Sequence, residues 1–381
     1  MADNAGKMGI GIIGYGGFGE FLRRSWDEMD NARVVAVCDS DPTRAPVGDV
    51  EFHEEVGPML ASEKVDIVSI ATPPNSHRDL AIMALEAGKH VLIEKPVALT
   101  AADGIHIKEA AQRTGRVATV DFMLRYNPVV EMLVKLTQSE VLGKIRRVDL
   151  RNYAMLDQVP EDHWFWNPQI SGRILVEHGV HFFDLARSVV GANAADVWSL
   201  GVERKPGIED RVFAAVKYEN DVVGTFWHSF SRPRLLETTT FHFVYDLGEV
   251  DMLGWIPLEL NIWGWTSKHG LDTLKALGEN IEIDSNRMEP TKTQSSEHLY
   301  DVEYDIDAKV RIEEPKLDIY ADNVRAILAD MIKTIENPSH KMRVTMDDAI
   351  EAVRTAEMAT TFAHPEDIKP SPLLSPETLR P

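Results

Sequence analysis

The stretch that decides the fold is Gly9-Ile10-Gly11-Ile12-Ile13-Gly14-Tyr15-Gly16-Gly17-Phe18-Gly19, near the start of the 381-residue chain. Residues 8–13 are apolar and predict a short buried strand, and residues 20–29 have the pattern of an amphipathic helix. Between them, Gly14, Gly16 and Gly19 form a Gly-x-Gly-x-x-Gly turn. The first glycine permits the tight bend, the second lets the backbone approach a pyrophosphate, and the third packs the helix on the strand. The helix N-terminus then offers free N–H groups to an anion.

A carboxylate follows at the spacing that a dinucleotide site requires. A second predicted strand, residues 33–38, ends at Asp39, where a carboxylate would bond the ribose hydroxyls. Because a carboxylate repels a 2′-phosphate, Asp39 favours NAD. Ser40 and Arg44 lie close by and together could accept a phosphate, which leaves NADP open. The alternative is a glycine turn followed by a chance aspartate, since this turn motif alone is weak evidence.

The bulk composition predicts a soluble two-domain protein. The chain is 44% hydrophobic and 27% charged, and its length suits two domains. A net charge of −21 argues against a nucleic-acid partner, because phosphate binding needs a basic face. The single cysteine, Cys38, excludes an intrachain disulfide framework and fits a small buried side chain in a reducing compartment. Residues 1–7 show no signal peptide, and no apolar run is long enough to span a membrane, so we expect a cytoplasmic protein.

Strands and helices continue to alternate through the first third of the chain. Apolar runs predict strands over 66–71, 90–94 and 117–121, separated by helices over 77–87 and 100–115. This alternation predicts a doubly wound parallel sheet of the Rossmann type over residues 1–126. Ligands of such sheets bind at the carboxyl ends of the strands, where residues 72–77, 94–96 and 121–126 fall.

Lys95 is the candidate catalytic residue at this edge. A lysine beside a cofactor can donate a hydrogen bond to a reacting hydroxyl or carbonyl oxygen and stabilise developing negative charge. The alternative is a solvated lysine at the end of a strand. Pro96 favours the first interpretation, because it restricts Lys95 to extended geometry and fixes the direction of the chain.

Four motifs together resemble the Gfo/Idh/MocA oxidoreductases: Gly14-x-Gly16-x-x-Gly19, Ala71-Thr72-Pro73-Pro74-Asn75-Ser76-His77, Glu94-Lys95-Pro96 and Phe122-Met123-Leu124-Arg125-Tyr126-Asn127-Pro128. Members of that family are nicotinamide-dependent enzymes that act on sugars, inositols and related polyols. The resemblance covers essentially the whole chain, and it implies that Lys95 is the catalytic lysine and that the Lys95–Pro96 region borders the nicotinamide. The expected cofactor contacts are Gly14, Tyr15, Gly16, Gly17, Phe18, Gly19, Asp39, Ser40, Arg44, Ala71, Thr72, Pro73, Asn75, His77, Glu94, Lys95, Met123 and Arg125.

A second group of reactive residues falls in the predicted helix 172–190. Glu177, His181 and Asp184 are spaced i, i+4 and i+7 and would share one face of that helix. Histidine titrates near neutral pH, so His181 can serve as an acid–base group. A metal site involving His178 is an alternative, but the spacing is not that of a zinc helix and no third ligand is evident, so we expect no metal. Histidines satisfied within the core are the other alternative.

The resemblance also covers this helix. Related dehydrogenases have Asp-x-x-x-His there, with the histidine as the acid–base residue; the matching positions are Glu177 and His181, so the acid is one methylene longer. The sequence therefore predicts a catalytic set of Lys95, His181 and Glu177, in which His181 takes the proton of a substrate hydroxyl and Lys95 polarises its oxygen. The expected substrate contacts are Lys95, Arg125, His163, Trp166, Glu177, His181 and Asp184.

The expected reaction is hydride transfer between NAD, or NADP, and a hydroxyl or carbonyl of a sugar, inositol or related polyol. Two alternatives share these residues. A lyase or glycosidase would oxidise its substrate only transiently and regenerate the cofactor. A regulator would bind sugar and NAD without turnover, but such a protein is expected to lose Lys95 or His181, and both are present.

The rest of the chain predicts an α+β domain over residues 127–363 that binds substrate. Short β-rich runs predict strands over 197–202, 211–218, 222–231 and 238–245 in a large, open, mostly antiparallel sheet. Its outer face often serves subunit association in the resembling family, which implies a homodimer or homotetramer. Trp255, Trp263 and Trp265 belong to that surface or to the core.

Four further segments complete the chain. Residues 278–315 are acidic and lack periodicity, so we expect an irregular insertion or edge connection. Residues 318–337 and 345–362 are predicted amphipathic helices. The proline-rich residues 364–381 are predicted to form a tail.

Overall fold

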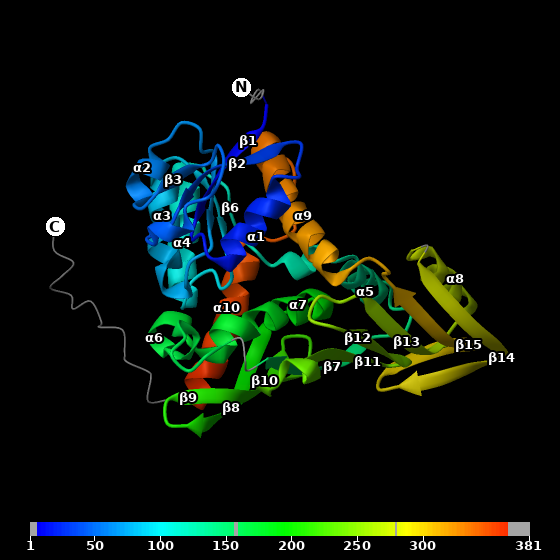
Figure 1. The fold of residues 1–381 in the computed structure, drawn as a ribbon. Coiled ribbons are helices and arrows are strands. Elements are labelled where there is room, and N and C mark those ends of the chain that lie inside the picture. Colours follow the sequence, from blue (N-terminus) through cyan, green and yellow to red (C-terminus); the bar gives the residue numbers. More distant parts are fainter. Residues whose placement is uncertain (1–5, 156–158, 279, 365–381) are drawn as a thin grey trace, which may run out of the picture.

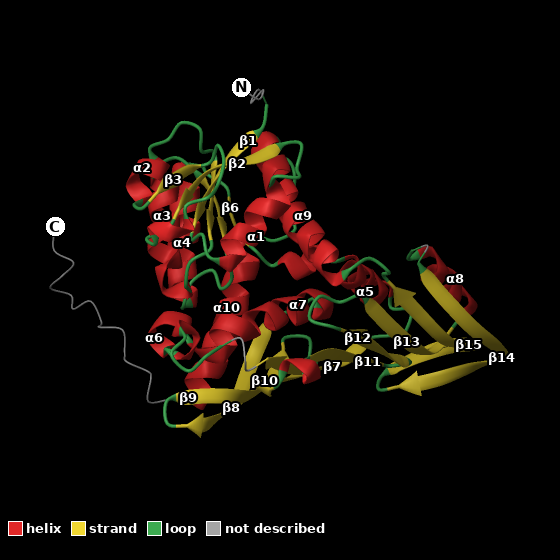
Figure 2. Ribbon diagram, viewed as in Figure 1, coloured by secondary structure: helices red, strands yellow, loops and turns green. Residues whose placement is uncertain are grey.

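The computed structural model describes residues 6–155, 159–278 and 280–364 of the chain. Two β-sheets with helices packed on them make up this part of the molecule (Figures 1 and 2). The predicted proline-rich tail lies outside the described residues except for residue 364, as do residues 1–5 of the polar N-terminal segment.

The first sheet has six parallel strands in the order β3-β2-β1-β4-β5-β6. Its central strands are almost wholly buried because helices cover both faces, which explains their continuous apolar sequence. The strands are β1 (Met8–Ile13), β2 (Ala32–Cys38), β3 (Glu51–His53), β4 (Ile67–Ile70), β5 (His90–Ile93) and β6 (Ala118–Val120). The helices between them are α1 (Gly17–Trp26), α2 (Val56–Leu60), α3 (His77–Glu86) and α4 (Ala101–Thr114).

The second sheet has nine strands in the order β14-β15-β13-β12-β11-β7-β10-β9-β8. Only β7 and β10 pair in parallel among its described strands, and every other pair is antiparallel. The strands are β7 (Ile145–Met155), β8 (Ala194–Lys205), β9 (Ile208–Tyr218), β10 (Val223–Arg232), β11 (Thr238–Tyr245), β12 (Gly248–Leu253), β13 (Glu259–Thr266), β14 (Ile281–Ser295) and β15 (His298–Arg311). The predicted fold class, a Rossmann sheet followed by a large, mostly antiparallel open sheet, is confirmed.

The expectation of an irregular segment over 278–315 is wrong. Residues Ile281–Ser295 and His298–Arg311 form a long hairpin, β14–β15, at the edge of the second sheet. β14 buries almost no side chain, so its sequence carries charged and polar residues in place of an apolar alternation. The sequence also gave no prediction for β12, β13 or for α8 (Lys268–Ala276), which is capped by Ser267.

The single helix expected over 172–190 is also wrong. A short α6 (Pro168–Ser171) ends at Gly172, whose φ of 73° is left-handed. A π-helical turn follows over Leu175–Gly179, and regular α-helix begins only with α7 (Val180–Val190). The wider turn shifts the residues before Val180 relative to those after it, so the i, i+4, i+7 face predicted for the helix does not apply.

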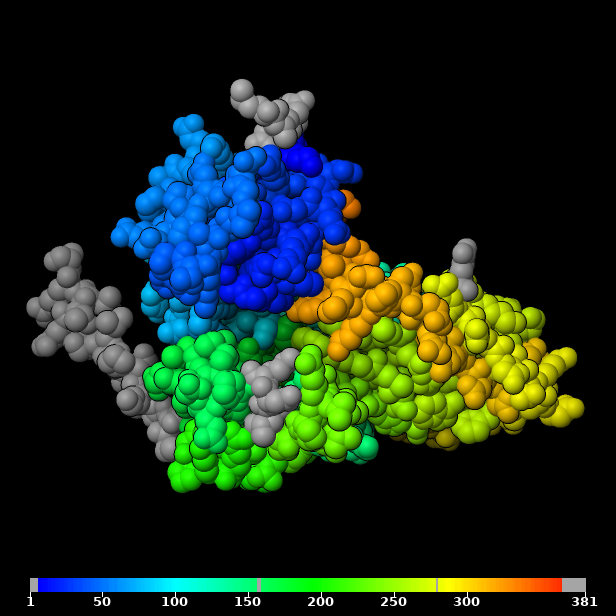
Figure 3. All heavy atoms as spheres, viewed as in Figure 1, coloured from blue at the N-terminus to red at the C-terminus, as the bar shows by residue number. Residues whose placement is uncertain are grey.

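The last two helices return to the first sheet. α9 (Lys316–Glu336) lies against α1, where the Trp26 indole donates to the carbonyl of Val324 at 3.0 Å. α10 (Met346–Ala363) packs on α4, α7 and β8, and Thr119 of β6 donates to the carbonyl of Val344 just before it. Figure 3 shows α9, in orange, filling the angle between the N-terminal part of the molecule and the second sheet. The connection from β6 runs through α5 (Pro128–Ser139), capped by Asn127.

Candidate functional site

The glycine loop brings three segments of backbone into close contact. Gly14 has a φ of 89°, and a Cβ on it would lie 2.6 Å from the carbonyl oxygen of Ala71. A Cβ on Gly19 would lie 2.2 Å from the carbonyl oxygen of Gly14, so only glycine lets α1 approach the end of β1 this closely. A Cβ on Gly17, the first residue of α1, would meet open space. The helix N-terminus is therefore accessible, and the loop fits the pyrophosphate of a dinucleotide.

Asp39 lies beside this loop, at the end of β2. Its carboxylate accepts hydrogen bonds from the backbone N–H of Tyr15 at 2.7 Å and of Asp41 at 3.0 Å, and it pairs with Arg44 at 3.1 Å. Ser40 is exposed. An open hollow of about 500 Å³ adjoins the pair and is lined by Tyr15, Gly16, Gly17, Glu20, Arg23, Arg44, Ala45, Pro46 and Val47. Carboxylate and guanidinium thus both lie where the adenosine end of a dinucleotide would bind.

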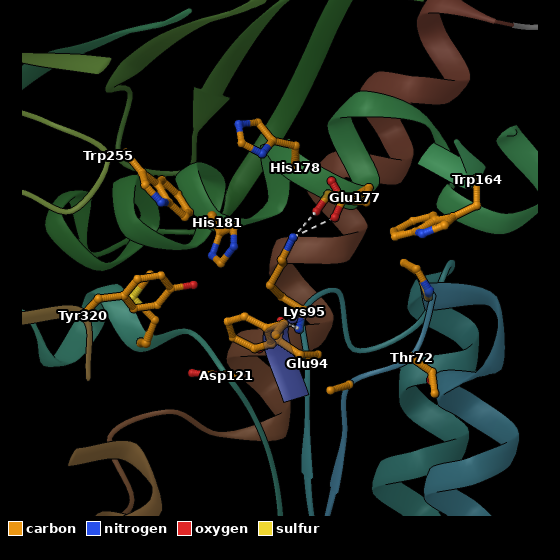
Figure 4. Close-up of a pocket in the computed structure, with 14 residues that line it drawn as sticks. Thr72, Glu94, Lys95, Asp121, Trp164, Glu177, His178, His181, Trp255 and Tyr320 are labelled. Carbon is orange, nitrogen blue, oxygen red and sulfur yellow. Dashed lines mark hydrogen bonds and ion pairs between the residues drawn. The ribbon is translucent and has the colours of Figure 1, made fainter. Parts of the chain in front are cut away.

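A second cavity, of about 260 Å³, lies at the carboxyl ends of β4, β5 and β6 (Figure 4). The π turn, the loop after residue 158, the β12–β13 connection and α9 close its other sides. Its lining consists of Phe18, Ala71, Thr72, Pro74, Glu94, Lys95, Asp121, Met123, Trp164, Glu177, His178, His181, Trp255 and Tyr320. The structure therefore brings the three predicted catalytic residues into one cavity, although Lys95 and Glu177 are 82 residues apart.

Glu177 fixes the position of the Lys95 amine. The Lys95 Nζ donates to Glu177 Oε1 at 2.8 Å and to the Glu177 carbonyl oxygen at 3.1 Å, as Figure 4 shows. Both side chains are mostly buried, so this ion pair is screened little by water. The ammonium is held in the cavity with a donor available to a substrate oxygen.

His181 is buried and uncharged. Burial, and then the Lys95 charge, hold the pKa of His181 well below its ordinary value. The ring packs edge-on against Trp255, with 4.9 Å between ring centroids, and no carboxylate orients it: Nδ1 has no hydrogen-bond partner among the described residues. A neutral imidazole has a lone pair with which to accept a proton.

Two carboxyl groups share the floor of the cavity. Glu94 and Asp121 are hydrogen-bonded to each other, and Glu94 also accepts from the Lys95 backbone N–H at 3.0 Å. Burial raises the pKa of Asp121 to about 6, and burial together with Asp121 raises the pKa of Glu94 well above its usual range. Two buried carboxyls this close hold a proton between them. No role was predicted for Asp121 from the sequence.

Arg125 and Asp184 do not line the cavity, contrary to the expectation that they bind substrate. Arg125 forms a two-pronged ion pair with Asp184, through Nε to Oδ2 at 2.8 Å and through Nη2 to Oδ1. Arg125 also approaches Asp348 of α10 at 3.4 Å, and Arg187 of α7 reaches the same carboxylate at 2.6 Å. These four residues join the end of the first domain to α7 and α10.

The aromatic loop presents a different tryptophan from the one expected. Trp166 is buried and its indole N–H donates to the carbonyls of Val159 and Pro160, whereas His163 caps the turn by accepting from the Phe165 N–H. Trp164 lines the cavity instead. A run of alternating aromatics indicates a wall of the site, but its local sequence does not say which ring faces inward.

Several expected cofactor contacts have other partners. The ring nitrogens of buried His77 lie 2.7 Å from the Pro96 carbonyl and 2.8 Å from that of Thr72, so His77 ties two loops together and does not line the cavity. Asn75 is exposed, and Pro74 rather than Pro73 lines the wall. Phe18, Ala71, Thr72 and Met123 do line it. Trp255 and Tyr320, which were not predicted as site residues, come from distant segments whose sequence has no local motif for a site.

Among the residues that the structure describes, no cluster of histidine, cysteine or acidic side chains is arranged to bind a metal ion. No helix within the described ranges is both long and apolar enough to cross a bilayer.

Known proteins resemble both halves of the chain. It is 28% identical to D-glucoside 3-dehydrogenase of Escherichia coli (strain K12) over 250 residues, which is 59% of this chain and 70% of that protein. It is 33% identical to inositol 2-dehydrogenase of Salmonella typhimurium (strain LT2) over 168 residues, covering 42% of this chain and 48% of the relative. An NAD-binding protein from Listeria innocua has the same fold, with a TM-score of 0.70, 22% identity, and coverage of 94% of this chain and 96% of that one.

Two family models match consecutive parts of the sequence. Residues 8–122 match the oxidoreductase family with an NAD-binding Rossmann fold, and residues 130–248 match the Gfo/Idh/MocA C-terminal domain. Together they cover more than half of the chain and confirm the resemblance seen in the sequence. The chain belongs to the Gfo/Idh/MocA oxidoreductase family.

Proposed function

We propose that the protein oxidises a hydroxyl group of a sugar, inositol or related polyol with NAD as the hydride acceptor. One observation carries the proposal: the Lys95 amine, held by Glu177, and neutral His181 line a single cavity at the carboxyl ends of the Rossmann strands. The names of the related glucoside and inositol dehydrogenases support the substrate class.

Each group at the site has a separate role in the proposed reaction. Nicotinamide, when bound, accepts the hydride. The glycine loop and the N-terminus of α1 would hold its pyrophosphate. Lys95 donates a hydrogen bond to the substrate oxygen and stabilises the negative charge that develops on it, while Glu177 keeps the ammonium in place. His181 accepts the hydroxyl proton, which its low pKa permits at neutral pH.

NAD is the cofactor that Asp39 favours. A 2′-phosphate would approach a buried carboxylate that already accepts two backbone hydrogen bonds. Arg44 offsets part of this repulsion, but its Nη1 is engaged by Asp39 itself. We therefore propose a preference for NAD over NADP.

The outer face of the second sheet supports association of identical subunits. Trp198, Leu200, Val223, Trp263 and Trp265 are exposed there, on the side away from α7 and α10, and the strand register places them on one face. We propose that this face joins two copies of the chain in a dimer or tetramer. We also propose a cytoplasmic location, which the buried, unpaired Cys38 supports.

The reaction is tested by following reduced cofactor with NAD or NADP and a panel containing myo-inositol, D-glucose and methyl β-D-glucopyranoside. Lys95→Met should lower kcat about a thousandfold, because it removes the donor to the reacting oxygen, and should leave NAD binding nearly unchanged. Lys64→Met, which alters an exposed ion pair with Glu51, is the control and should retain full activity.

Three outcomes would contradict the proposal. Equal turnover by Lys95→Met would remove the role of Lys95. Product formation without net reduced cofactor would favour the lyase or glycosidase alternative. Binding of panel sugars without any chemical change would favour a regulator.

A further inference from the structure

His178 lines the cavity but has no role in the proposed reaction. It follows Glu177 in the π turn, and both line the cavity together with His181. Consecutive residues of a regular α-helix point about 100° apart, and π turns are frequent at functional sites. In Figure 4 His178 lies on the cavity wall between Trp255 and Glu177.

A buried amide determines how the His178 ring can be protonated. His178 Nε2 lies 2.9 Å from Asn152 Oδ1, and Asn152 Nδ2 donates to Thr239 Oγ1 at 2.9 Å. His228 Nδ1 is 3.4 Å from the same Asn152 oxygen. Asn152, Thr239 and His228 stand side by side on β7, β11 and β10, in matching register, and all three are buried.

The hydrogen-bond capacity of the amide leaves one arrangement for the ring. Since the Asn152 nitrogen is used by Thr239, only an acceptor oxygen faces His178, so the proton of His178 resides on Nε2. Burial, with the Lys95 charge, lowers the pKa of His178 to about 3, so the ring is neutral. Nδ1 is then an unprotonated acceptor.

Nδ1 of His178 is free to meet a ligand. It has no hydrogen bond within the described residues. His228 Nε2 and His181 Nδ1 also lack a partner but are sealed from solvent, whereas His178 Nδ1 is not. The neighbouring Lys95 ammonium can only donate, and Glu177 is already occupied by it. An acceptor beside a donor suits a pair of adjacent hydroxyl groups.

We propose that His178 is a specificity-determining residue, whose Nδ1 accepts a hydrogen bond from a second hydroxyl of the polyol, next to the one that is oxidised. This inference rests on the proposed function. Asn152 is a positioning residue that holds His178 in the accepting tautomer. The site therefore selects substrates with adjacent hydroxyls and rejects analogues in which the second hydroxyl is missing.

Kinetics with the fastest-oxidised member of the panel named above test the contact. His178→Phe keeps an aromatic ring but removes the acceptor, so KM should rise about 10- to 100-fold while kcat changes little. A monodeoxy analogue that lacks the second hydroxyl should bind the wild-type protein more weakly than the full substrate does. The His178→Phe variant should bind this analogue no more weakly than the wild-type protein binds it. His106→Phe, on the exposed side of α4, should behave as wild type.

The tautomer can be measured without any substrate. In the full chain labelled with 15N-histidine, the signal lost in His178→Gln identifies His178, and its long-range proton couplings show which nitrogen carries hydrogen. Hydrogen on Nε2 is expected; hydrogen on Nδ1 would overturn the inference. Asn152→Asp adds a negative charge next to the ring, so His178 should become protonated as the pH falls and KM should rise at low pH only. Lys95, Glu177, His181 and His228 are the other titratable groups around the ring, and all remain in this variant.

The outcomes separate the two proposals. Wild-type turnover with an unchanged KM in His178→Phe would overturn the inference alone. A KM that is raised at every pH in Asn152→Asp would mean that the His178 ring donates to the substrate. That result would also overturn the inference. A wild-type chain that oxidises no panel member would overturn the proposed function, and with it the polyol contact, whatever the tautomer.

Discussion

At the residue scale, the longer side chain of Glu177 has a clear use. The sequence has a glutamate where the resembling dehydrogenases have aspartate, and its carboxylate accepts a hydrogen bond from the Lys95 amine at 2.8 Å. His181 consequently depends on packing against Trp255 and Phe122 for its orientation. Lys95 and Glu177 thus act as a hydrogen-bonded pair, and the acid–base residue, His181, is not hydrogen-bonded to that pair within the described residues.

The proton that Asp121 releases first from the Glu94–Asp121 pair should make stability depend on pH. The pKa of Asp121 is about 6 in the folded protein, against about 4 unfolded. The folded state therefore binds the proton more tightly, and the free energy of unfolding falls as the pH rises from about 4 to 6. Asp121→Asn removes this titration and should raise stability at pH 7 by at most ~3 kcal/mol, with little change at pH 4.

Thermal unfolding of the cofactor-free protein across this pH range measures the effect. Asp196→Asn, at an exposed position on β8, is the control and should keep the wild-type pH slope. An Asp121→Asn variant with the same slope as wild type would mean that the pKa of Asp121 is not raised in the folded protein.

The residues of the site were predictable to different degrees. Lys95 stood out because a short motif places it at the end of a predicted strand, and His181 because it lies beside acidic residues on a predicted helix. Trp255 and Tyr320 did not, since their place in the cavity comes from tertiary packing of β12–β13 and α9. Arg125 and Asp184 carried the right chemistry for substrate binding, but neutralise each other.

At the element scale, the Arg125–Asp184 pair should hold α7 against the end of the Rossmann domain. Asp184→Asn leaves a buried guanidinium with only Asp348 to neutralise it, so we expect a loss of about 3 kcal/mol in unfolding free energy. Denaturant unfolding provides the measurement. Glu86→Gln, which breaks an exposed pair with Arg113, should cost less than about 1 kcal/mol. A raised KM with unchanged stability would instead restore Asp184 as a substrate contact.

The elements of the first domain were easier to predict than those of the second. A buried parallel strand is a continuous apolar run, and each predicted strand of the first domain has its counterpart in the sheet. Exposed strands such as β14 lack that signal, because solvent covers most of their side chains. The π turn could not be predicted from hydrophobic periodicity, because one extra residue in a turn changes a 3.6-residue repeat too little to be detected.

At the scale of the whole molecule, the exposed face of the second sheet should determine the oligomeric state. Trp265 is 52% exposed on β13, in line with the other apolar residues of that face. Trp265→Glu should shift the mass in light scattering toward the 42.7 kDa of one chain, because it places a charge in the interface. Val47→Glu, on an exposed loop of the first domain, should leave the mass unchanged. A wild-type monomer at all concentrations would contradict the proposed assembly.

The return of α9 to the first domain has a consequence for synthesis. Tyr320 of α9 contacts Phe18 and Phe21 next to the glycine loop, and the Trp26 indole needs the carbonyl of Val324. Some 300 residues separate these partners along the chain. The glycine loop leaves the ribosome early, but the wall that α9 supplies exists only after residue 324 has emerged. A nascent chain stalled before α9 should therefore bind dinucleotide poorly, and cofactor loading should belong to the final stage of translation.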